Sequence, residues 1–124
     1  KGNADVNRAT KDGATPAYTA AQKGHLEVLR LLVEKGNADV NRATKDGATP
    51  AYTAAQKGHL EVLRLLFEKG ADLNQPDGRG WTPAHAATEK GHVEVLMLLV
   101  EKGMMDGATP THIAAEYGHL DADM

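Results

Sequence analysis

Hydrophobic residues between Gly24 and Gly36 recur at steps of three and four positions. In the stretch HLEVLRLLVEK, the residues Leu26, Leu29 and Leu32 follow this spacing, and Val33 extends it. Such a period places apolar side chains on one side of a helix, so the pattern predicts an amphipathic helix here. Gly36 is expected to end it.

A shorter helix is predicted immediately upstream, in TPAYTAAQK. The hydroxyl of Thr15 can cap free backbone amides, and Pro16 suits the first helical position because its missing N–H is not needed there. The alanines favour helix, and Gly24 supplies the left-handed turn that ends it. Two antiparallel helices should result. The link NADVNRATKDGA that follows them is rich in Asn, Asp and Gly, and should project as a β-hairpin-like finger.

This arrangement is repeated along the chain. The first two copies are identical except for Val33 and Phe67, the third has drifted, and the fourth is shortened. The copies span approximately residues 1–34, 35–68, 69–101 and 102–124. Their Thr-Pro pairs are spaced by 34, 33 and 27 residues. A period near 33 indicates stacked units that cannot bury their apolar faces alone, so we predict a single repeat domain over residues 1–124.

The repeated strings resemble a known family. DGATPAYTAAQKGHLEVLRLLVEKG, GRGWTPAHAATEKGHVEVLMLLVEKGAD and DGATPTHIAAEYGHL are similar to the ankyrin repeat, with its G-x-TPLH-x-AA core, GH pair and leucine-rich second helix. The resemblance covers nearly the whole chain. It implies a mainly α ankyrin-repeat solenoid of stacked antiparallel helix pairs with β-hairpin-like finger loops.

Three departures from the family pattern carry structural expectations. Tyr18 and Tyr52 stand where the family has histidine, so the imidazole hydrogen bonding should be lost in two repeats. The extra residues Asn3 and Asn37 should be absorbed by the loops at little cost. The segment before the fourth repeat, residues 103–107, lacks six residues relative to residues 70–80, so a short, tight connection is expected there.

Composition and charge narrow the class of function. The net charge is −3, with no basic stripe to attract phosphates, so nucleic acid is not expected as a partner. Apolar runs are too short to span a bilayer and no signal-peptide pattern opens the chain. The absence of cysteine fits a reducing compartment, and we expect a cytoplasmic or otherwise intracellular location.

The sequence gives little support for a catalytic or a metal-binding site. His85 and His92 are spaced by seven residues, as are His112 and His119, but no site gathers the three or four ligands that zinc needs. The histidines that follow the helix-ending glycines instead mark the start of each second helix. The chain has no cysteine or serine to act as a nucleophile. We therefore predict a protein that is not an enzyme and that carries no catalytic residues, metal or cofactor.

The resemblance implies binding of another protein through the finger tips and the exposed side of the first helices. The family positions fall in the first two copies on Ala9, Lys11, Asp12, Ala14, Gln22, Lys23, Ala43, Lys45, Asp46, Ala48, Gln56 and Lys57. In the last two copies they fall on Pro76, Gly78, Arg79, Trp81, Glu89, Lys90, Ala108, Glu116 and Tyr117.

Trp81 is the most informative of these positions. It is the only tryptophan, it replaces an alanine of the other copies, and Arg79 lies beside it. Tryptophan and arginine are enriched in binding hot spots, so a site centred on Arg79, Trp81 and Lys90 is predicted. The structural alternative is that the indole folds over the neighbouring fingers and covers apolar surface. Phe67 is expected to pack at the junction of the second and third copies.

Two other interpretations remain open. Near-identical copies also fit an engineered or recently amplified scaffold or spacer without its own partner, and the chain could be the targeting segment of a larger protein. The first repeat lacks a polar cap on its outer side. We therefore expect a longer array or self-association through the uncapped end.

Overall fold

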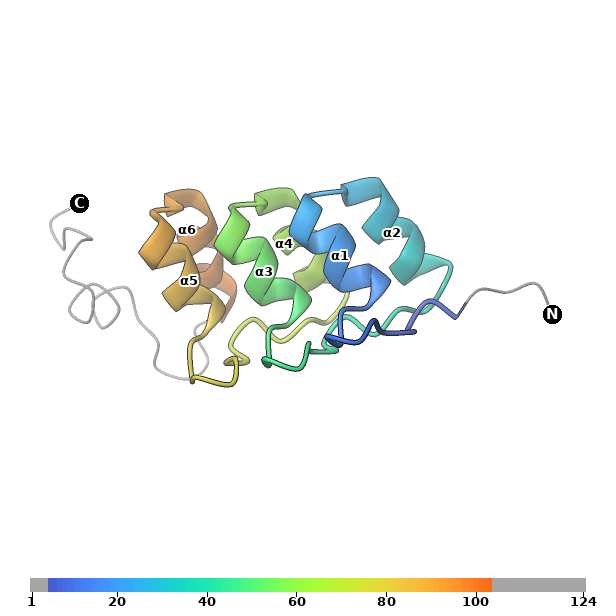
Figure 1. Cartoon of the computed structure of the whole chain (residues 1–124). Helices are drawn as coiled ribbons and strands as arrows, with labels where there is room; N and C mark the ends of the chain where they lie inside the picture. Colours follow the sequence, from blue (N-terminus) through green and yellow to red (C-terminus); the bar gives the residue numbers. More distant parts are fainter. Residues whose placement is uncertain (1–4, 104–124) are drawn as a thin grey trace, which may run out of the picture.

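Three helix pairs form the part of the chain, residues 5–103, that this computed structural model describes. We call them repeats 1 to 3, each with the finger that precedes it. Their helices are α1 (Pro16–Lys23) and α2 (Leu26–Glu34), α3 (Pro50–Lys57) and α4 (Leu60–Glu68), and α5 (Pro83–Lys90) and α6 (Val93–Gly103). One layer holds α1, α3 and α5, the second holds α2, α4 and α6, and the fingers extend from one edge (Figure 1). The predicted mainly α fold of stacked helix pairs is confirmed. The short connection expected before the fourth repeat lies outside the described residues.

The first helix of each repeat begins and ends as predicted. The Thr15 hydroxyl accepts the Tyr18 N–H at 3.2 Å, Pro16 opens the helix, and Gly24 ends it with a left-handed φ of 75°. An equivalent threonine and proline begin α3 and α5, and an equivalent glycine ends each of them. In α5 the imidazole of His85 adds a reciprocal bond, because its Nδ1 accepts the Thr82 N–H at 3.1 Å. A tyrosine at this position in α1 and α3 cannot make that bond.

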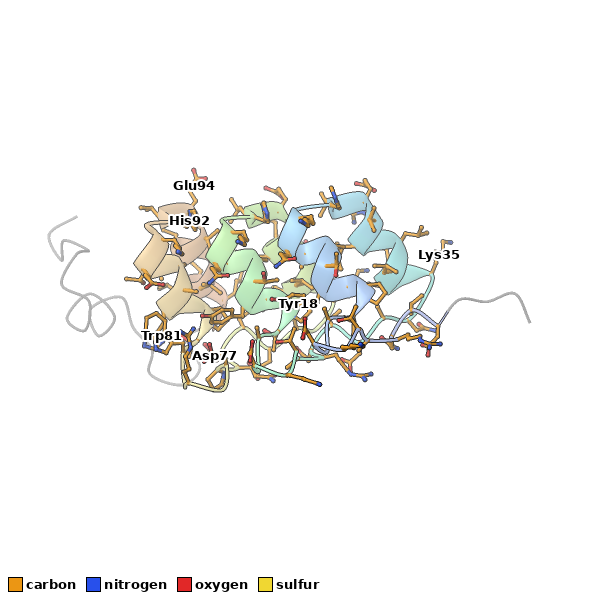
Figure 2. All side chains as sticks on the ribbon, in the orientation of Figure 1. Tyr18, Lys35, Asp77, Trp81, His92 and Glu94 are labelled. Atoms are coloured by element: carbon orange, nitrogen blue, oxygen red, sulfur yellow. The ribbon has the colours of Figure 1, made fainter. Side chains whose placement is uncertain are left out.

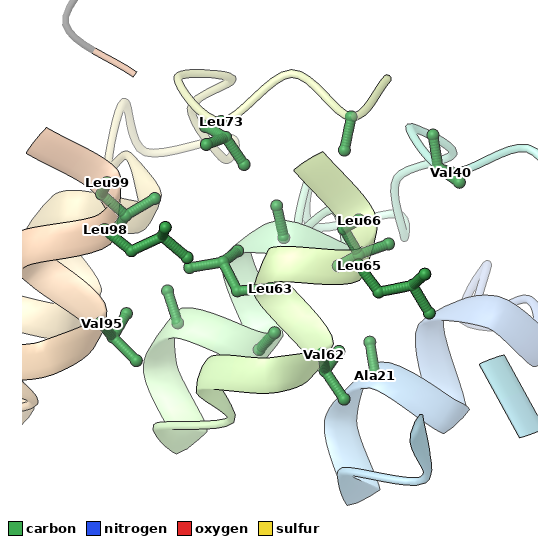
Figure 3. Close-up of a cluster of buried hydrophobic side chains, with 14 of the residues drawn as sticks. Ala21, Val40, Val62, Leu63, Leu65, Leu66, Leu73, Val95, Leu98 and Leu99 are labelled. Carbon is green, nitrogen blue, oxygen red and sulfur yellow. The ribbon is translucent and has the colours of Figure 1, made fainter. Parts of the chain in front are cut away.

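The leucine-rich second helices supply most of the core. Leu29, Leu63 and Leu96, which hold equivalent positions in the three repeats, are all buried. Val62 and Leu65 of α4, like Val95 and Leu98 of α6, fill the space toward the preceding repeat (Figure 3).

Phe67 lies at the predicted junction but is less enclosed than a packing role would suggest. Its side chain is 37% exposed, and the Lys102 ammonium lies 5.7 Å from the ring centroid. The ring therefore contacts α6 and also faces solvent.

Each finger is a turn closed by a pair of hydrogen bonds. Thr10 donates its N–H to the Ala14 carbonyl at 2.9 Å, and the Thr10 hydroxyl accepts the Ala14 N–H at 3.2 Å. Thr44 and Ala48 repeat this pair, and no residue between 5 and 103 is assigned to a strand. The fingers are thus hairpin-like in hydrogen bonding, but too short to form strands.

Neighbouring repeats are joined by polar contacts at both ends of the helices. At the finger end, the Lys45 N–H donates to the Asp12 carbonyl at 2.9 Å. At the other end, Nε2 of His59 lies 3.1 Å from the Gln22 carbonyl oxygen. The equivalent pairs between repeats 2 and 3 join Gly78 to Asp46 at 2.8 Å and His92 to Gln56 at 3.0 Å. His59 and His92 therefore have structural roles, as the sequence suggested.

The extra residue Asn37 is accommodated in a left-handed conformation. Its φ is 56°, and the following Ala38 still donates its N–H to the Leu32 carbonyl at the helix end. In the next link, which lacks this residue, Gly70 takes the left-handed position and Ala71 bonds to Leu66. Asparagine tolerates this conformation better than most residues, so the insertion leaves the start of the next finger in register.

Candidate functional site

The third finger differs from the first two in the residue that closes it. Asp77 occupies the place of Thr10 and Thr44, and its N–H donates to the Trp81 carbonyl at 2.7 Å. Its carboxylate Oδ1 accepts the N–H groups of Arg79 and Trp81 at 2.8 and 3.0 Å. The aspartate therefore closes the finger as threonine does, and adds a negative charge inside it.

That charge holds the side chain of Arg79. Asp77 Oδ2 accepts hydrogen bonds from Nε and Nη2 of Arg79 at 3.1 and 2.9 Å. Nη2 also donates to the hydroxyl of Tyr52 at 3.0 Å, and the guanidinium carbon lies 5.0 Å from the Trp81 ring centroid. Tyr52 belongs to α3, so Arg79 connects repeat 3 to repeat 2. The Arg79 side chain still exposes 65% of its surface.

Trp81 lies at the finger end of α5, beside Asp77 (Figure 2). Its ring is half-buried, and the ring centroid is 5.8 Å from that of His85 at an interplanar angle of 45°. The Arg79 guanidinium and the His85 imidazole both lie close to the indole, and each belongs to the same repeat. The indole is thus held in place while part of its surface faces solvent.

The environment shifts the pKa values of the two groups that hold Arg79 in opposite directions. Burial works to raise the pKa of Asp77, but the N–H groups of Trp81 and Arg79 and the Arg79 guanidinium outweigh it, so the pKa is lowered. For Tyr52, burial raises the pKa, and the Asp77 charge adds to this effect. Asp77 therefore stays ionised and Tyr52 stays neutral near pH 7.

The predicted centre of the site does not form one cluster. Arg79 and Trp81 lie together at the start of α5, whereas Glu89 and Lys90 lie at its opposite end. Eight helical residues span about 12 Å, so Lys90 cannot share a contact point with Trp81. Lys90 is thus separated from Arg79 and Trp81 by the length of α5, and a partner surface that contacts all three residues stays a prediction.

The remaining predicted positions fall into two separate rows. Lys11, Asp12, Lys45 and Asp46 are exposed at the finger tips. At the opposite edge, Lys23 and Lys57 are exposed near helix C-termini. Gln22 and Gln56 beside them are half-buried, and their backbone carbonyl oxygens contact the histidine of the next repeat. Three more positions lie outside the described residues: Ala108, Glu116 and Tyr117.

Sequence reasoning missed Asp77 and Tyr52 as parts of this site. Asp77 precedes Gly78, and an Asp-Gly pair is typical of a turn, which accounts for the finger but not for the bonds to Arg79. The available signal was its alignment with Thr10 and Thr44, since it is a charged residue at a position that otherwise carries a hydroxyl. For Tyr52 the sequence indicated a lost imidazole bond, but gave no sign that Arg79 would reach it from the next finger.

Other kinds of site are not apparent in this part of the chain. No group of three or more His, Cys, Asp or Glu side chains within residues 5–103 could hold a metal ion. Over the same residues, no helix is both long and apolar enough to cross a membrane.

Comparison with known proteins supports the resemblance seen in the sequence. A family model described as ankyrin repeats (3 copies) matches residues 2–77 and 74–122. The comparison with curated proteins finds no match. The matched segments include the three helix pairs and the finger that carries Asp77, Arg79 and Trp81.

Proposed function

Because the chain belongs to the ankyrin repeat family, whose repeats are generally protein–protein interaction modules, we propose that it holds a partner protein through its fingers and inner-helix face. We place the main contact at the Arg79–Trp81 corner, defined as Asp77, Arg79, Trp81 and Tyr52. The function is non-enzymatic, with no nucleic acid, membrane or cofactor involved. The expected intracellular location stays a prediction.

One observation carries this proposal: an exposed arginine is held against a tryptophan before any partner arrives. Long side chains lose conformational entropy when a partner immobilises them, at about 0.5–1.5 kcal/mol each. Asp77 and Tyr52 already restrict the Arg79 guanidinium, and the guanidinium lies 5.0 Å from the Trp81 ring. The corner is therefore preorganised, and it combines the two residue types most enriched in hot spots.

The charges of the corner indicate what kind of partner surface it suits. Arg79 and Asp77 neutralise each other, so attraction by net charge is weak. We expect an apolar or aromatic group of the partner to stack on the indole, with a carbonyl or carboxylate accepting from the free side of the guanidinium. Binding through this corner should depend little on added salt, whereas binding through Lys11, Lys45, Lys23 and Lys57 should weaken steeply.

The proposal is tested by capturing proteins from a lysate of the source cells on the immobilised chain. The site variant carries Arg79→Ala and Trp81→Ala, and a matched control carries Lys23→Ala and Lys57→Ala at the opposite edge. Helicity is checked for both. We expect a protein retained by the original chain and the control, and bound at least about 30-fold more weakly by the site variant. Equal retention by all three would overturn the location of the site.

The scaffold or spacer interpretation keeps one specific observation in its favour. The first two fingers present the same side chains, because Val33 and Phe67 are the sole difference between copies 1–34 and 35–68. Identical fingers offer a partner no distinct contacts along that part of the array. If no protein is retained by the original chain, the spacer interpretation replaces the binding proposal.

A further inference from the structure

A cleft lies where repeat 3 packs on repeat 2, at the edge of the molecule opposite the fingers. Leu60 of α4 lines one side of it, and His92, Val93, Glu94 and Val95 at the start of α6 line the other, around a volume of about 260 Å³. Figure 2 shows His92 and Glu94 at this edge, away from the Arg79–Trp81 corner. The cleft is therefore a separate place on the surface.

The walls of the cleft are largely apolar and are fixed in position. Val95 is buried in the core, and Leu60 packs against the core. The His92 ring is held by its Nε2, which lies 3.0 Å from the Gln56 carbonyl oxygen. At the mouth, repeat 3 carries Val93 where repeat 2 has the larger Leu60. The cleft is thus formed without a partner, and its walls suit an aliphatic chain.

In repeats 1 and 2, a glutamate at the start of the second helix is paired with an arginine on the next turn. Oε1 of Glu27 lies 3.5 Å from Nε of Arg30, and Oε1 of Glu61 lies 3.4 Å from Nε of Arg64. Glu94 holds the same position on α6. The two pairs show which group a carboxylate at this position receives within the molecule, namely a guanidinium.

Repeat 3 lacks this arginine. Met97 stands at its position, and Glu94 takes part in no ion pair within the part of the chain that the structure describes. A following repeat does not cover this position, because Arg30 and Arg64 keep 40% and 47% of their side chains exposed although another repeat follows each of them. The Glu94 carboxylate therefore lies beside an apolar cleft without the cation that its equivalents have.

We propose that this cleft binds an arginine side chain of the partner protein, which supplies the guanidinium that Met97 does not. The guanidinium pairs with Glu94, and the aliphatic stem lies in the cleft against Leu60 and Val93. Arginine suits such a site because its guanidinium is weakly hydrated and matches a carboxylate, while its methylene groups pack on apolar surface. The inference rests on the proposed binding of a partner protein, and it adds a contact at the edge opposite the Arg79–Trp81 corner.

The charges around the cleft make direct contact with Glu94 decisive. Lys57 and Lys90 lie at the same edge, at the C-termini of α3 and α5, and they oppose the attraction of a cation from a distance. Binding therefore depends on the short-range pair between the guanidinium and the carboxylate. A neutral group of the same shape should bind poorly.

Titration of the full chain with N-acetylarginine methylamide, followed by NMR of the backbone amides, is the test. The matched probe is the citrulline derivative, which has the shape of arginine without its charge. We expect saturable shifts at Val93, Glu94 and Val95 with the arginine probe, and at least about fivefold weaker binding of the citrulline probe. Shifts that do not saturate, that lie elsewhere, or that are equal for both probes overturn the proposal.

Two variants and a matched control test the role of the carboxylate. Glu94→Gln removes the charge, and Met97→Arg supplies an internal arginine that should occupy Glu94 as Arg64 occupies Glu61. Each should weaken binding of the arginine probe at least about fivefold. The control Glu101→Gln, at the other end of α6, should leave it unchanged. All three positions are exposed, so the variants should keep the parent helicity. Unchanged binding in E94Q or M97R, or an equal loss in E101Q, overturns the proposal.

The titration needs no partner protein, so it can fail independently of the lysate capture. A chain that fails the titration but retains a partner through the Arg79–Trp81 corner contradicts the arginine cleft alone. A chain that binds the arginine probe but retains no partner contradicts the proposed function.

Discussion

Repeats 1 and 2 have nearly the same sequence but different surroundings. His25 and Thr19 are exposed in repeat 1, whereas in repeat 2 His59 bonds to the preceding repeat and Thr53 is buried. Val28 and Leu31 differ from Val62 and Leu65 in the same way. In a repeat array the stability is approximately a sum of terms within repeats and terms between neighbours. Comparing repeats 1 and 2 therefore separates the two kinds of term. Contributions that are equal in both repeats arise within the repeat, and contributions that differ arise at the junction with the preceding repeat.

The largest expected difference lies in the apolar junction. Leu65→Ala should lower the free energy of unfolding by about 3 kcal/mol, because it removes a buried side chain and leaves a cavity between repeats. Leu31→Ala should change it by less than about 0.5 kcal/mol, because the side chain is exposed. Urea unfolding followed by circular dichroism, at a concentration where the chain is monomeric, measures both. Equal losses would show that the two repeats are not distinguished by their neighbours.

Repeat 2 is also held from its other side, through Asp77 and Arg79. Asp77→Ala should lower the free energy of unfolding by about 2 kcal/mol at neutral pH, because the finger N–H groups and the Arg79 guanidinium lose their acceptor. Asp77→Thr restores the finger closure seen at Thr10 and Thr44, and should cost about 1 kcal/mol. Urea unfolding at pH 7 measures the stability of both variants. If Asp77→Thr is no more stable than Asp77→Ala, finger closure makes no separate contribution to the role of Asp77.

The same aspartate predicts a pH dependence. Its pKa in the folded chain lies below its usual value of 3.8, so its contribution to stability is present above that value and is lost as the pH falls through the folded pKa. Below about pH 3.8, the original chain should therefore lose its advantage over Asp77→Thr. The difference between their unfolding free energies, measured from about pH 7 to about pH 2.5, should shrink toward acid, and a constant difference would refute the lowered pKa.

Histidine at the start of the second helix gives a smaller contrast. His59→Ala should cost about 1 kcal/mol, because it removes the hydrogen bond to the Gln22 carbonyl that joins repeats 1 and 2. His25→Ala should cost less than about 0.5 kcal/mol, since His25 is exposed and no helix pair precedes it among residues 5–103. Thermal unfolding of the two variants measures the difference. If His25→Ala is as unstable as His59→Ala, the histidine stabilises its own repeat and not the junction with the preceding one.

The helices, their caps and the stacking could all be predicted from the sequence, because they rest on local signals that recur. Thr15–Pro16 and Gly24 mark helix ends wherever they occur, and the leucine period marks the core. The Arg79–Trp81 corner was located only in part. Arg79 and Trp81 stand out by composition, but the hydrogen bond from Arg79 to Tyr52 crosses a repeat boundary. Sequence position also did not show that Lys90 lies at the other end of α5 from Trp81. For Val28, the sequence predicted only that the first repeat lacks a polar cap on its outer side. It could not predict how exposed this side chain is, because burial depends on neighbouring repeats.

The smallest contrast concerns a hydroxyl group that is buried at the junction. The Thr53 hydroxyl has no hydrogen-bond partner among the described residues, and repeat 3 carries Ala86 at the same position. Thr53→Ala removes an unsatisfied polar group and improves helix propensity, but it also loses a packed methyl group. We expect a net gain of about 1 kcal/mol, against about 0.5 kcal/mol for Thr19→Ala, where propensity acts alone because the side chain is exposed. Urea unfolding of both variants decides the sign. A loss on Thr53→Ala would mean that the methyl packing outweighs the hydroxyl, so that the junction favours threonine for its shape.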